Sequence, residues 1–221
     1  MITGLIAEFI GTFALIFVGA GAICADALSG GKLGITGIAL AHGLTIMAMA
    51  YALGHISGGH FNPAVTIAML VNKRIKLQNA LAYVVVQLAG ASLAALLLKS
   101  VAPSLADAAP YLGACDLNGI SAGVGVLVEA VLTFFLVMVI WGTAVDGRSP
   151  KAMAPLAIGF TITLDILMGG YFTGAALNPA RAFGPALVTC HWANQCVYWI
   201  GPILGAIAAG LLGEKVFLKS K

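Results

Sequence analysis

Charged side chains are scarce in this sequence of 221 residues, because Asp, Glu, Lys and Arg together make up only 9% of it. Hydrophobic residues account for 61%, and the mean hydropathy is +1.03. Soluble domains usually carry about 25% charged residues. This composition therefore excludes a soluble globular fold and predicts an integral membrane protein. The formal net charge of +3 gives no reason to expect a nucleic-acid partner.

The sequence also lacks the patterns of a catalytic or metal site. It contains no phosphate-binding loop and no catalytic constellation. Its four cysteines and four histidines do not show the spacing of a zinc site. We therefore expect no enzymatic activity, no cofactor and no bound metal.

Six apolar stretches are long enough to cross the hydrocarbon core of a membrane, which takes about 20 helical residues. They cover residues 4–25, 35–53, 81–101, 122–143, 153–170 and 197–212. The first stretch contains Glu8 and has no basic segment before it, so it is predicted to be a span and not a cleavable leader. The predicted fold class is an all-α membrane protein with six transmembrane helices.

Lys and Arg are distributed unevenly over the segments between these stretches. With six spans, one side of the membrane carries Lys73, Arg74, Lys76, Arg148, Lys151, Lys215, Lys219 and Lys221. The other side carries only Lys32 and Lys99. The positive-inside rule therefore predicts that both termini are cytoplasmic, and we expect the cell membrane as the location.

The tripeptide Asn-Pro-Ala occurs twice and predicts two helix starts. One copy is Asn62-Pro63-Ala64 and the other is Asn178-Pro179-Ala180; Ser57-Gly58 and Thr173-Gly174 precede them at the same distance. Asn is a favoured N-cap and Pro a favoured first helical residue. The apolar runs that follow, 63–71 and 179–188, reach only about 13 to 15 Å each. Two such half-helices placed end to end would nearly match a core of about 30 Å.

Glycine-rich segments precede both half-helices, at residues 54–60 and 169–174. Irregular backbone is prohibitive in lipid but is tolerated where it lines a water-filled cavity. The two segments therefore predict a pore, with the half-helices entering it from opposite sides and meeting at the asparagines.

The two halves of the sequence resemble each other. The segment Ala7-Glu8-Phe9 corresponds to Val128-Glu129-Ala130, and each half holds one Asn-Pro-Ala copy. Because each half has three spans, the second must enter the membrane from the opposite side, which is an inverted repeat. We predict one channel domain over residues 1–221, with repeats at about 1–101 and 122–221 joined by an extracellular loop at 102–121.

Over nearly its whole length the sequence resembles the aquaporin, or major intrinsic protein, family. The resemblance is carried by residues 7–13, 54–66 and 173–185, which include both Asn-Pro-Ala copies and Arg181. It implies a passive channel that passes water in single file, excludes ions and protons, and assembles as a homotetramer with one pore per subunit. Half-helix N-termini carry partial positive charge, and asparagine N–H groups can donate to a passing water oxygen.

The family resemblance also implies a narrow outer constriction formed by His42, Ile166, Ala175 and Arg181. This set is similar to that of plant tonoplast intrinsic proteins. Small Ala175 and aliphatic Ile166 leave room beside the polar pair, so we hypothesise conduction of water and of a small neutral solute such as ammonia. Glycerol or urea conduction is the alternative, but Ala182 and Ala186 stand where glycerol facilitators have an acidic and a basic residue.

Carboxylates inside spans are costly and usually functional. The family resemblance implies that Glu8 and Glu129 orient the irregular loops by accepting hydrogen bonds, with a proton relay as the alternative. We expect His55 and His60 to hydrogen-bond the first loop. The role and charge of Asp165, next to Ile166, stay open.

A gradient-coupled transporter and a structural junction protein are the alternatives to a channel. A gradient-coupled transporter also uses inverted repeats and broken helices, but would normally show more ionisable residues at a central site. A structural junction protein would show no permeability.

The four cysteines, Cys24, Cys115, Cys190 and Cys196, all map to the outer side in this topology. A disulfide between the loop of Cys115 and that of Cys190 or Cys196 is one possibility, and four unpaired thiols are the other.

Overall fold

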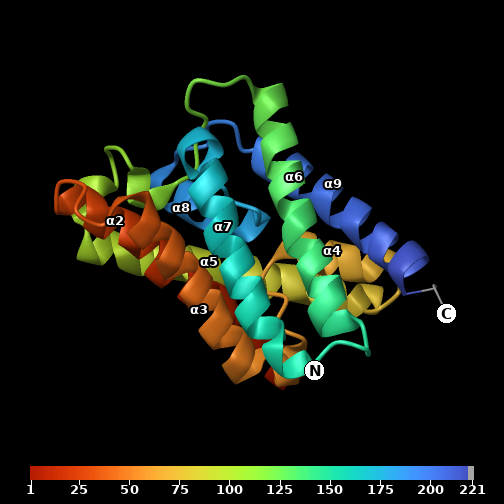
Figure 1. Ribbon diagram of the computed structural model, residues 1–221. Helices are drawn as coiled ribbons and strands as arrows, with labels where there is room; N and C mark the ends of the chain where they lie inside the picture. The colour runs from red at the N-terminus through yellow and green to blue at the C-terminus, as the bar shows by residue number, and fades with distance from the viewer. Residues whose placement is uncertain (219–221) are drawn as a thin grey trace.

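Helices make up nearly the whole of the computed structural model, which describes residues 1–218 and contains no strand within them. Nine α-helices follow one another in that range (Figure 1). Lys219 and Lys221, which entered the orientation prediction, lie outside the described residues. The helices are α1 (Ile2–Ala14), α2 (Gly21–Leu28), α3 (Gly34–Ser57), α4 (Pro63–Val71), α5 (Leu77–Val101), α6 (Ala122–Ile140), α7 (Ala154–Thr173), α8 (Pro179–Thr189) and α9 (Val197–Leu212).

Six helical segments are long and apolar enough to cross a membrane, so the predicted fold class is confirmed. They are Ile2–Leu28, Gly34–Ser57, Leu77–Val101, Ala122–Val145, Lys151–Thr173 and Val197–Phe217. The first joins α1 to α2 through a π-helical segment, Leu15–Ala20. Each segment extends beyond the predicted bounds at one or both ends, because polar and glycine residues at the ends of the apolar stretches are also helical.

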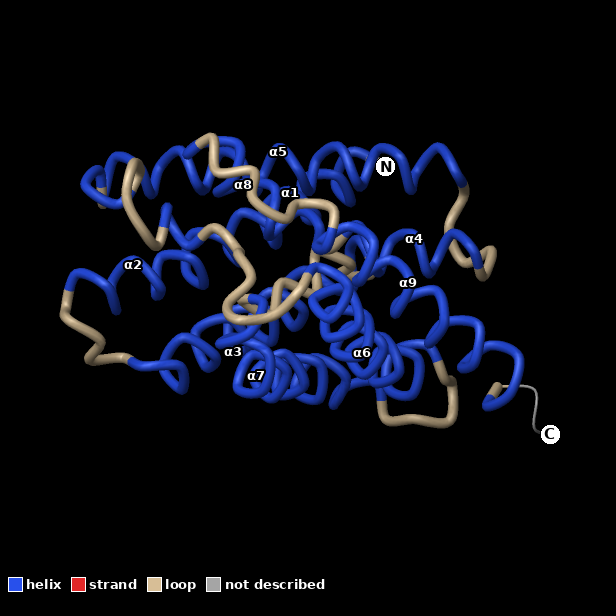
Figure 2. Tube along the Cα trace, turned by 90° about the horizontal axis from the view of Figure 1, so that it is seen from above, coloured by secondary structure: helices blue, strands red, loops and turns tan. Residues whose placement is uncertain are grey.

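The two remaining helices, α4 and α8, are the short ones that follow the Asn-Pro-Ala copies. They run over nine and eleven residues, and each has proline at its first position. In Figure 2, loop segments cross the middle of the view with helices on both sides of them. The predicted half-helix from 63 to 71 has the bounds of α4, and α8 extends one residue beyond the predicted 179–188.

Helix packing follows the same scheme in both halves of the chain. Helix α1 packs along α5 and α6 packs along α9, while α3 and α7 contact each other. Each short helix contacts the third span of the other half: α4 packs on α9, and α8 packs on α5. This exchange places both short helices inside one bundle and brings their first residues together.

Close approach of the paired helices depends on glycine at equivalent places. A Cβ atom on Gly90 of α5 would collide with the backbone oxygen of Phe9 in α1. A Cβ atom on Gly205 of α9 would collide in the same way with the backbone oxygen of Ala130 in α6. These glycines let the outer helix pairs pack backbone against backbone, as small residues do in membrane helices.

The polar and apolar residues are distributed as in a protein surrounded by lipid. Large apolar side chains such as Val85, Leu127 and Leu164 are more than half exposed, whereas Glu8, Gln87 and Glu129 are fully buried. Apolar side chains on the outside are compatible with contact to lipid tails. Buried polar groups, in contrast, require hydrogen-bond partners inside the protein.

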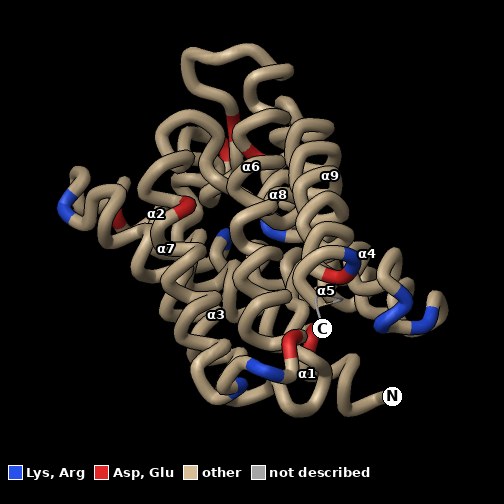
Figure 3. The backbone as a smooth tube through the Cα atoms, turned by 45° about the vertical axis from the view of Figure 1, so that its right-hand side comes forward, with Lys and Arg blue, Asp and Glu red and all other residues tan. Residues whose placement is uncertain are grey.

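Most charged side chains lie near the ends of the helices (Figure 3). At one end, Arg74 pairs with Glu214 at 2.8 Å, and Arg148 bonds both Asp146 and the backbone oxygen of Phe217. These bonds join the segment after α4, the link between α6 and α7, and the C-terminal segment. The basic residues that carried the orientation prediction within the described range therefore cluster at one end.

Candidate functional site

A buried carboxylate holds the irregular segment before α4. The Oε1 atom of Glu8 accepts hydrogen bonds from Ser57 Oγ at 2.7 Å and from the His60 backbone N–H at 2.9 Å. Its Oε2 atom accepts from the Phe61 backbone N–H at 2.6 Å and from Gln87 Nε2 at 2.8 Å. The backbone N–H groups of this segment are thus directed toward α1.

Glu129 holds the segment before α8 in the same way. Its Oε1 atom accepts from Thr173 Oγ1 at 2.7 Å and from the Ala176 N–H at 2.9 Å. Its Oε2 atom accepts from the Leu177 N–H at 2.8 Å. Both carboxylates therefore satisfy consecutive backbone donors that have no helical partner, which leaves the carbonyl oxygens of Phe61 and Leu177 for other contacts.

The irregular segments are shorter than the sequence predicts. Helix α3 continues through Gly54 to Ser57, and α7 continues through Gly169 and Gly170 to Thr173. Both helices end at a left-handed glycine, Gly58 with φ 92° and Gly174 with φ 80°. The predicted irregular segments, 54–60 and 169–174, therefore begin several residues before the helices end. Glycine ends a helix where the backbone must adopt positive φ, and the earlier glycines remain helical.

Asn62 and Asn178 cap the two short helices. The Asn62 Oδ1 atom accepts from the Ala64 N–H at 2.8 Å. The Asn178 Oδ1 atom accepts from the Ala180 N–H at 3.0 Å and from the Arg181 N–H at 3.3 Å. Each cap uses the oxygen of the side-chain amide and leaves its NH2 group free to donate elsewhere.

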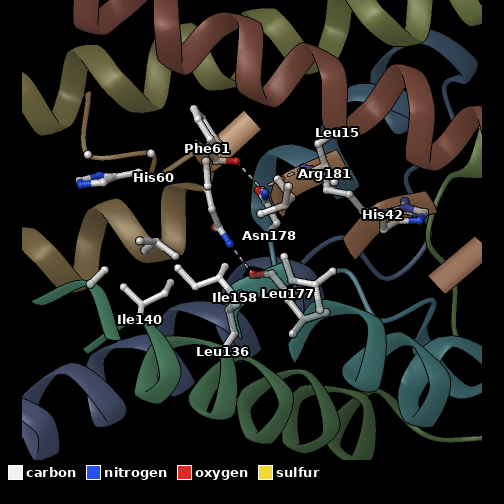
Figure 4. A pocket seen from close by; sticks show the side chains of 18 of the residues that line it. Leu15, His42, His60, Phe61, Leu136, Ile140, Ile158, Leu177, Asn178 and Arg181 are labelled. Atoms are coloured by element: carbon white, nitrogen blue, oxygen red, sulfur yellow. Dashed lines mark hydrogen bonds between the residues drawn. The ribbon is translucent and has the colours of Figure 1, made fainter. Parts of the chain in front are cut away.

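Each asparagine also bonds the loop that precedes the other asparagine. Asn62 Nδ2 donates to the Leu177 backbone oxygen at 2.8 Å, and Asn178 Nδ2 donates to the Phe61 backbone oxygen at 2.9 Å. Figure 4 shows both bonds as dashed lines across the pocket. An amide NH2 group has two donors, so one N–H of each asparagine has no protein acceptor among residues 1–218. Both asparagines border the cavity.

The cavity has a volume of about 330 Å³ and runs past both asparagines. All four predicted constriction residues line it: His42, Ile166, Ala175 and Arg181. Aliphatic side chains, including Ile46, Ile158 and Ile162, form much of the remaining wall. Arg74 and Lys151 border it near the end that carries the basic cluster. A path in which polar groups are spaced along an aliphatic wall suits small neutral molecules.

Arg181 is 2% exposed and is fixed by the linker between α5 and α6. Its Nη1 atom donates to the Gly113 backbone oxygen at 2.6 Å and to Cys115 Sγ at 2.8 Å, while its buried Nε has no partner in the described part of the chain. Burial raises the pKa of the Cys115 thiol to about 11, although Arg181 acts to lower it. Cys115 is therefore a neutral thiol that accepts through its sulfur, a role that sequence reasoning missed.

His42 lies on α3 and is 3% exposed. Its Nδ1 atom bonds the Ile38 backbone oxygen at 2.9 Å, so Nδ1 carries a proton because a carbonyl only accepts. The buried Nε2 atom has no protein partner among residues 1–218. A Cβ atom on Gly19 would lie 2.5 Å from the imidazole, so glycine at that position makes room for the ring.

The two loop histidines differ in position. His60 Nδ1 lies 3.0 Å from Thr66 Oγ1, and its ring packs edge-on against Tyr83 beside the cavity. His55 is exposed in the last turn of α3, and no hydrogen bond from its side chain is found within the described range. Its predicted part in orienting the loop therefore has no hydrogen bond among residues 1–218 to support it.

Asp165 is 5% exposed, and its Oδ2 atom has no hydrogen-bond partner within the described part of the chain. It does not border the cavity, although Ile166 beside it does.

All four cysteines are free thiols, which decides between the two alternatives left by the sequence. Cys24 and Cys115 are buried, whereas Cys190 and Cys196 are exposed. Cys115 is directed to Arg181, so it does not form the loop-to-loop disulfide that the sequence left open as one of two alternatives. The outer-side placement of four residues could indicate a bridge but could not reveal this contact.

Comparisons with known proteins agree with the geometry. The family model described as "Major intrinsic protein" matches residues 1–212. The chain is 43% identical over 223 residues to "Aquaporin TIP4-4" of Zea mays, covering 98% of this chain and 87% of that protein. It is 43% identical over 227 residues to "Probable aquaporin TIP3-2" of Arabidopsis thaliana, covering 97% and 84%. Among solved structures, the aquaglyceroporin from Plasmodium falciparum matches with a TM-score of 0.88 at 25% identity, covering 98% of this chain and 96% of that one.

Proposed function

Because this chain belongs to the major intrinsic protein family and is a passive transmembrane water channel, not an enzyme, we propose that water crosses it in single file between Asn62 and Asn178. We also propose that ammonia follows the same path while ions and protons are excluded. The observation that carries this proposal is the meeting of both capped half-helices, and of Arg181, on one cavity.

The asparagines act on the passing water through their remaining N–H groups. Each helix N-terminus contributes about half a positive charge, and the two short helices point their N-termini at the same place. A water oxygen that accepts from both amides cannot at the same time accept a proton from a neighbouring water. Cations meet two positive helix ends there, so the centre of the channel disfavours both hydroxonium and metal ions.

Arg181 and His42 select among neutral solutes at the narrow end. Among the described residues, the guanidinium Nε donor and the His42 Nε2 atom have no protein partner. The side chains of Ile166 and Ala175 offer no polar group. Such a wall binds one small polar molecule on one side and leaves the other side apolar. Ammonia is close to water in size and can both donate and accept, so it satisfies this wall as water does.

Glycerol conduction is the second candidate, because the similar solved structure from Plasmodium falciparum is that of an aquaglyceroporin. Two observations argue against carrying that solute over to this chain. Ala182 and Ala186 of α8 are small and fully buried, where glycerol facilitators have charged residues. In addition, a buried Arg181 held by two linker atoms leaves the constriction little freedom to widen.

We extend the proposal to the Glu8 and Glu129 carboxylates as loop-orienting groups, to a homotetramer with one channel per subunit, and to cytoplasmic termini in the cell membrane. The hydrogen bonds of the two carboxylates support the loop-orienting role. The exposed apolar helix faces support the homotetramer, and the basic residues at one end support cytoplasmic termini. Chemical cross-linking of the purified protein and protease protection of tagged termini test the last two.

Stopped-flow light scattering of proteoliposomes with water, ammonia, urea and glycerol gradients tests the proposed solute range. We expect rapid water and ammonia permeation with a low activation energy, slow glycerol and urea permeation, and no dependence on ion gradients. Accumulation driven by an ion gradient would instead indicate a coupled transporter, and glycerol flux matching the ammonia flux would favour the second candidate.

A further inference from the structure

His191 contacts the linker between α5 and α6 at two separate points. Its Nε2 atom lies 3.0 Å from Asp116 Oδ2, and its ring stacks on Tyr111 with the ring centroids 4.2 Å apart and an interplanar angle of 11°. His191 itself follows α8, so it joins the segment after the second half-helix to the linker. The two contacts enclose residues 111–116, which we call the arginine cradle.

The arginine cradle contains both partners of the Arg181 guanidinium. Gly113 provides the backbone oxygen at 2.6 Å and Cys115 the sulfur at 2.8 Å. Gly113 and Cys115 lie between the two residues that His191 contacts. The position of the guanidinium in the constriction therefore depends on the position of the cradle.

The backbone of the arginine cradle is strained. Tyr111, Leu112 and Gly113 are consecutive left-handed residues with φ 49°, 53° and 78°. Non-glycine residues in this region persist only where their surroundings hold them. Leu112 is fully buried, and Tyr111 is held by backbone hydrogen bonds with Ala108 and Ala114 as well as by the stack on His191. The stack therefore adds to an end of the cradle that is already held, and the hydrogen bond from His191 to Asp116 fixes the other end.

Asp116 anchors the other end of the cradle as an acceptor. Its Oδ1 atom accepts from the Leu117 N–H and from Asn194 Nδ2, each at 2.8 Å. Burial acts to raise the pKa of Asp116, but the hydrogen bonds from Asn194, Leu117 and His191 outweigh it and the pKa falls below its ordinary value. Because an ionised carboxylate only accepts, His191 Nε2 carries the proton of the bond between them.

We propose that His191 is a positioning residue for the selectivity of this channel, acting on Arg181 through the arginine cradle. The proposal rests on the proposed role of Arg181 in the constriction. His191 does not border the cavity, so its effect on the solute passes through the linker. It supplies two separable interactions, a donated hydrogen bond to Asp116 and a ring stack on Tyr111.

Stopped-flow measurements on proteoliposomes with matched variants test this assignment. The variants are H191A, which removes both interactions, H191Q, which keeps a donor at nearly the same reach, H191F, which keeps the stack, and D116A. The control is D107A, because Asp107 is an exposed carboxylate of the same linker outside the cradle. The quantity measured is the ratio of urea to water permeability, which a simple loss of folded channel does not change.

We expect this ratio to rise about threefold in H191A and D116A, since a freed guanidinium no longer closes the constriction to a larger solute. H191F is expected to rise as well, and H191Q and D107A to stay near the wild-type ratio. An H191A ratio equal to that of D107A would overturn the proposal. So would an H191Q ratio as high as that of H191A.

If H191A does not reach the membrane, the comparison of H191F with H191Q decides in the same way. Wild-type protein that conducts neither water nor ammonia would instead refute the proposed function, because that outcome does not involve the cradle. The two failures are therefore distinguishable in one set of measurements.

Discussion

Asn62 and Asn178 each donate to the carbonyl oxygen of the residue that precedes the other, at 2.8 Å and 2.9 Å. The two half-helices are thus joined at their first residues by a pair of reciprocal bonds, in addition to the packing around them. Each amide contributes its oxygen to its own helix, one N–H to the opposite loop, and has a second N–H beside the cavity. No other residue type supplies this combination in one short side chain.

Replacing Asn178 with Asp tests that division of roles. A carboxylate can still cap α8, but it cannot donate to the Phe61 oxygen or to water, and its charge opposes the positive helix ends. We expect water permeability to fall by about tenfold and cation conductance to rise, because one hydrogen bond to the loop and the central positive potential are both weakened. Stopped-flow and electrical recording measure the two effects.

Asn118 provides the control for this substitution, since it is an exposed asparagine in the linker. N118D adds the same charge away from the cavity and should leave both properties unchanged. Equal behaviour of N178D and N118D would show that the Asn178 amide has no part in conduction.

Replacing Glu8 or Glu129 with Gln tests the buried carboxylates. A Gln amide has one oxygen, so its NH2 group must face a backbone donor, Phe61 N–H in the first case and Leu177 N–H in the second. Leaving a buried donor unsatisfied costs about 1–3 kcal/mol. The free energy of unfolding of both variants should fall by that amount, measured by thermal unfolding in detergent. D107N is the exposed counterpart and should retain wild-type stability.

Phenylalanine at position 42 or 175 tests the proposed passage of ammonia. Either substitution fills space in the constriction, and H42F also removes the polar ring. The ratio of ammonia to water permeability should fall at least about threefold in proteoliposomes. L164F changes a lipid-exposed residue of α7 and should leave the ratio as it is. Unchanged ratios in H42F and A175F would refute ammonia selection by this constriction.

Alanine at Gly205 tests the close contact of α9 with α6. The added Cβ atom would collide with the Ala130 backbone oxygen, so the two helices must separate. Overpacking of this kind costs about 1–3 kcal/mol, measured as reduced thermal stability. By contrast, Gly123 lies in an α6 position with open space around it, and G123A should stabilise by about 0.5 kcal/mol.

Acid should remove the contribution of Asp116 to stability. Because its folded-state pKa lies below the ordinary value of 3.8, its ionised form favours the folded state above that pH. The part of the stability difference between wild type and D116N that comes from ionised Asp116 should therefore be lost as the pH falls below about 4. A stability difference that grew between about pH 4 and lower pH would contradict the direction of this pKa shift.

Much of the fold could be predicted from the sequence because its signals are local. The lengths of the apolar stretches predict the six spans. An Asn N-cap followed by Pro predicts the first residues of α4 and α8. The predicted loops were less accurate, since Gly54 and Gly169 looked like helix ends. In these segments positive φ occurs only at the later glycines, Gly58, Gly59 and Gly174. A sequence does not display backbone angles, so it cannot tell these glycines from the earlier ones.

The candidate site was predictable where spacing from the asparagines decides it. His42, Ile166, Ala175 and Arg181 all line the cavity, as the family resemblance implied. The partners of Arg181 were not predictable, because Gly113 and Cys115 lie in a linker without periodicity and far away in the chain. The sequence of this linker also leaves a disulfide of Cys115 open, but in the structure Cys115 accepts a hydrogen bond from the Arg181 guanidinium.

The packing of α4 on α9 has a consequence for how the protein is made. Helix α4 ends at Val71, but the surface on which it packs begins at Val197. During synthesis, α4 can therefore reach its final packing only after nearly the whole chain, including α9, has left the ribosome. Contacts so distant along the chain form late and slowly. Truncation within α9 should then remove the surface on which α4 packs, even though every residue of the first half is present.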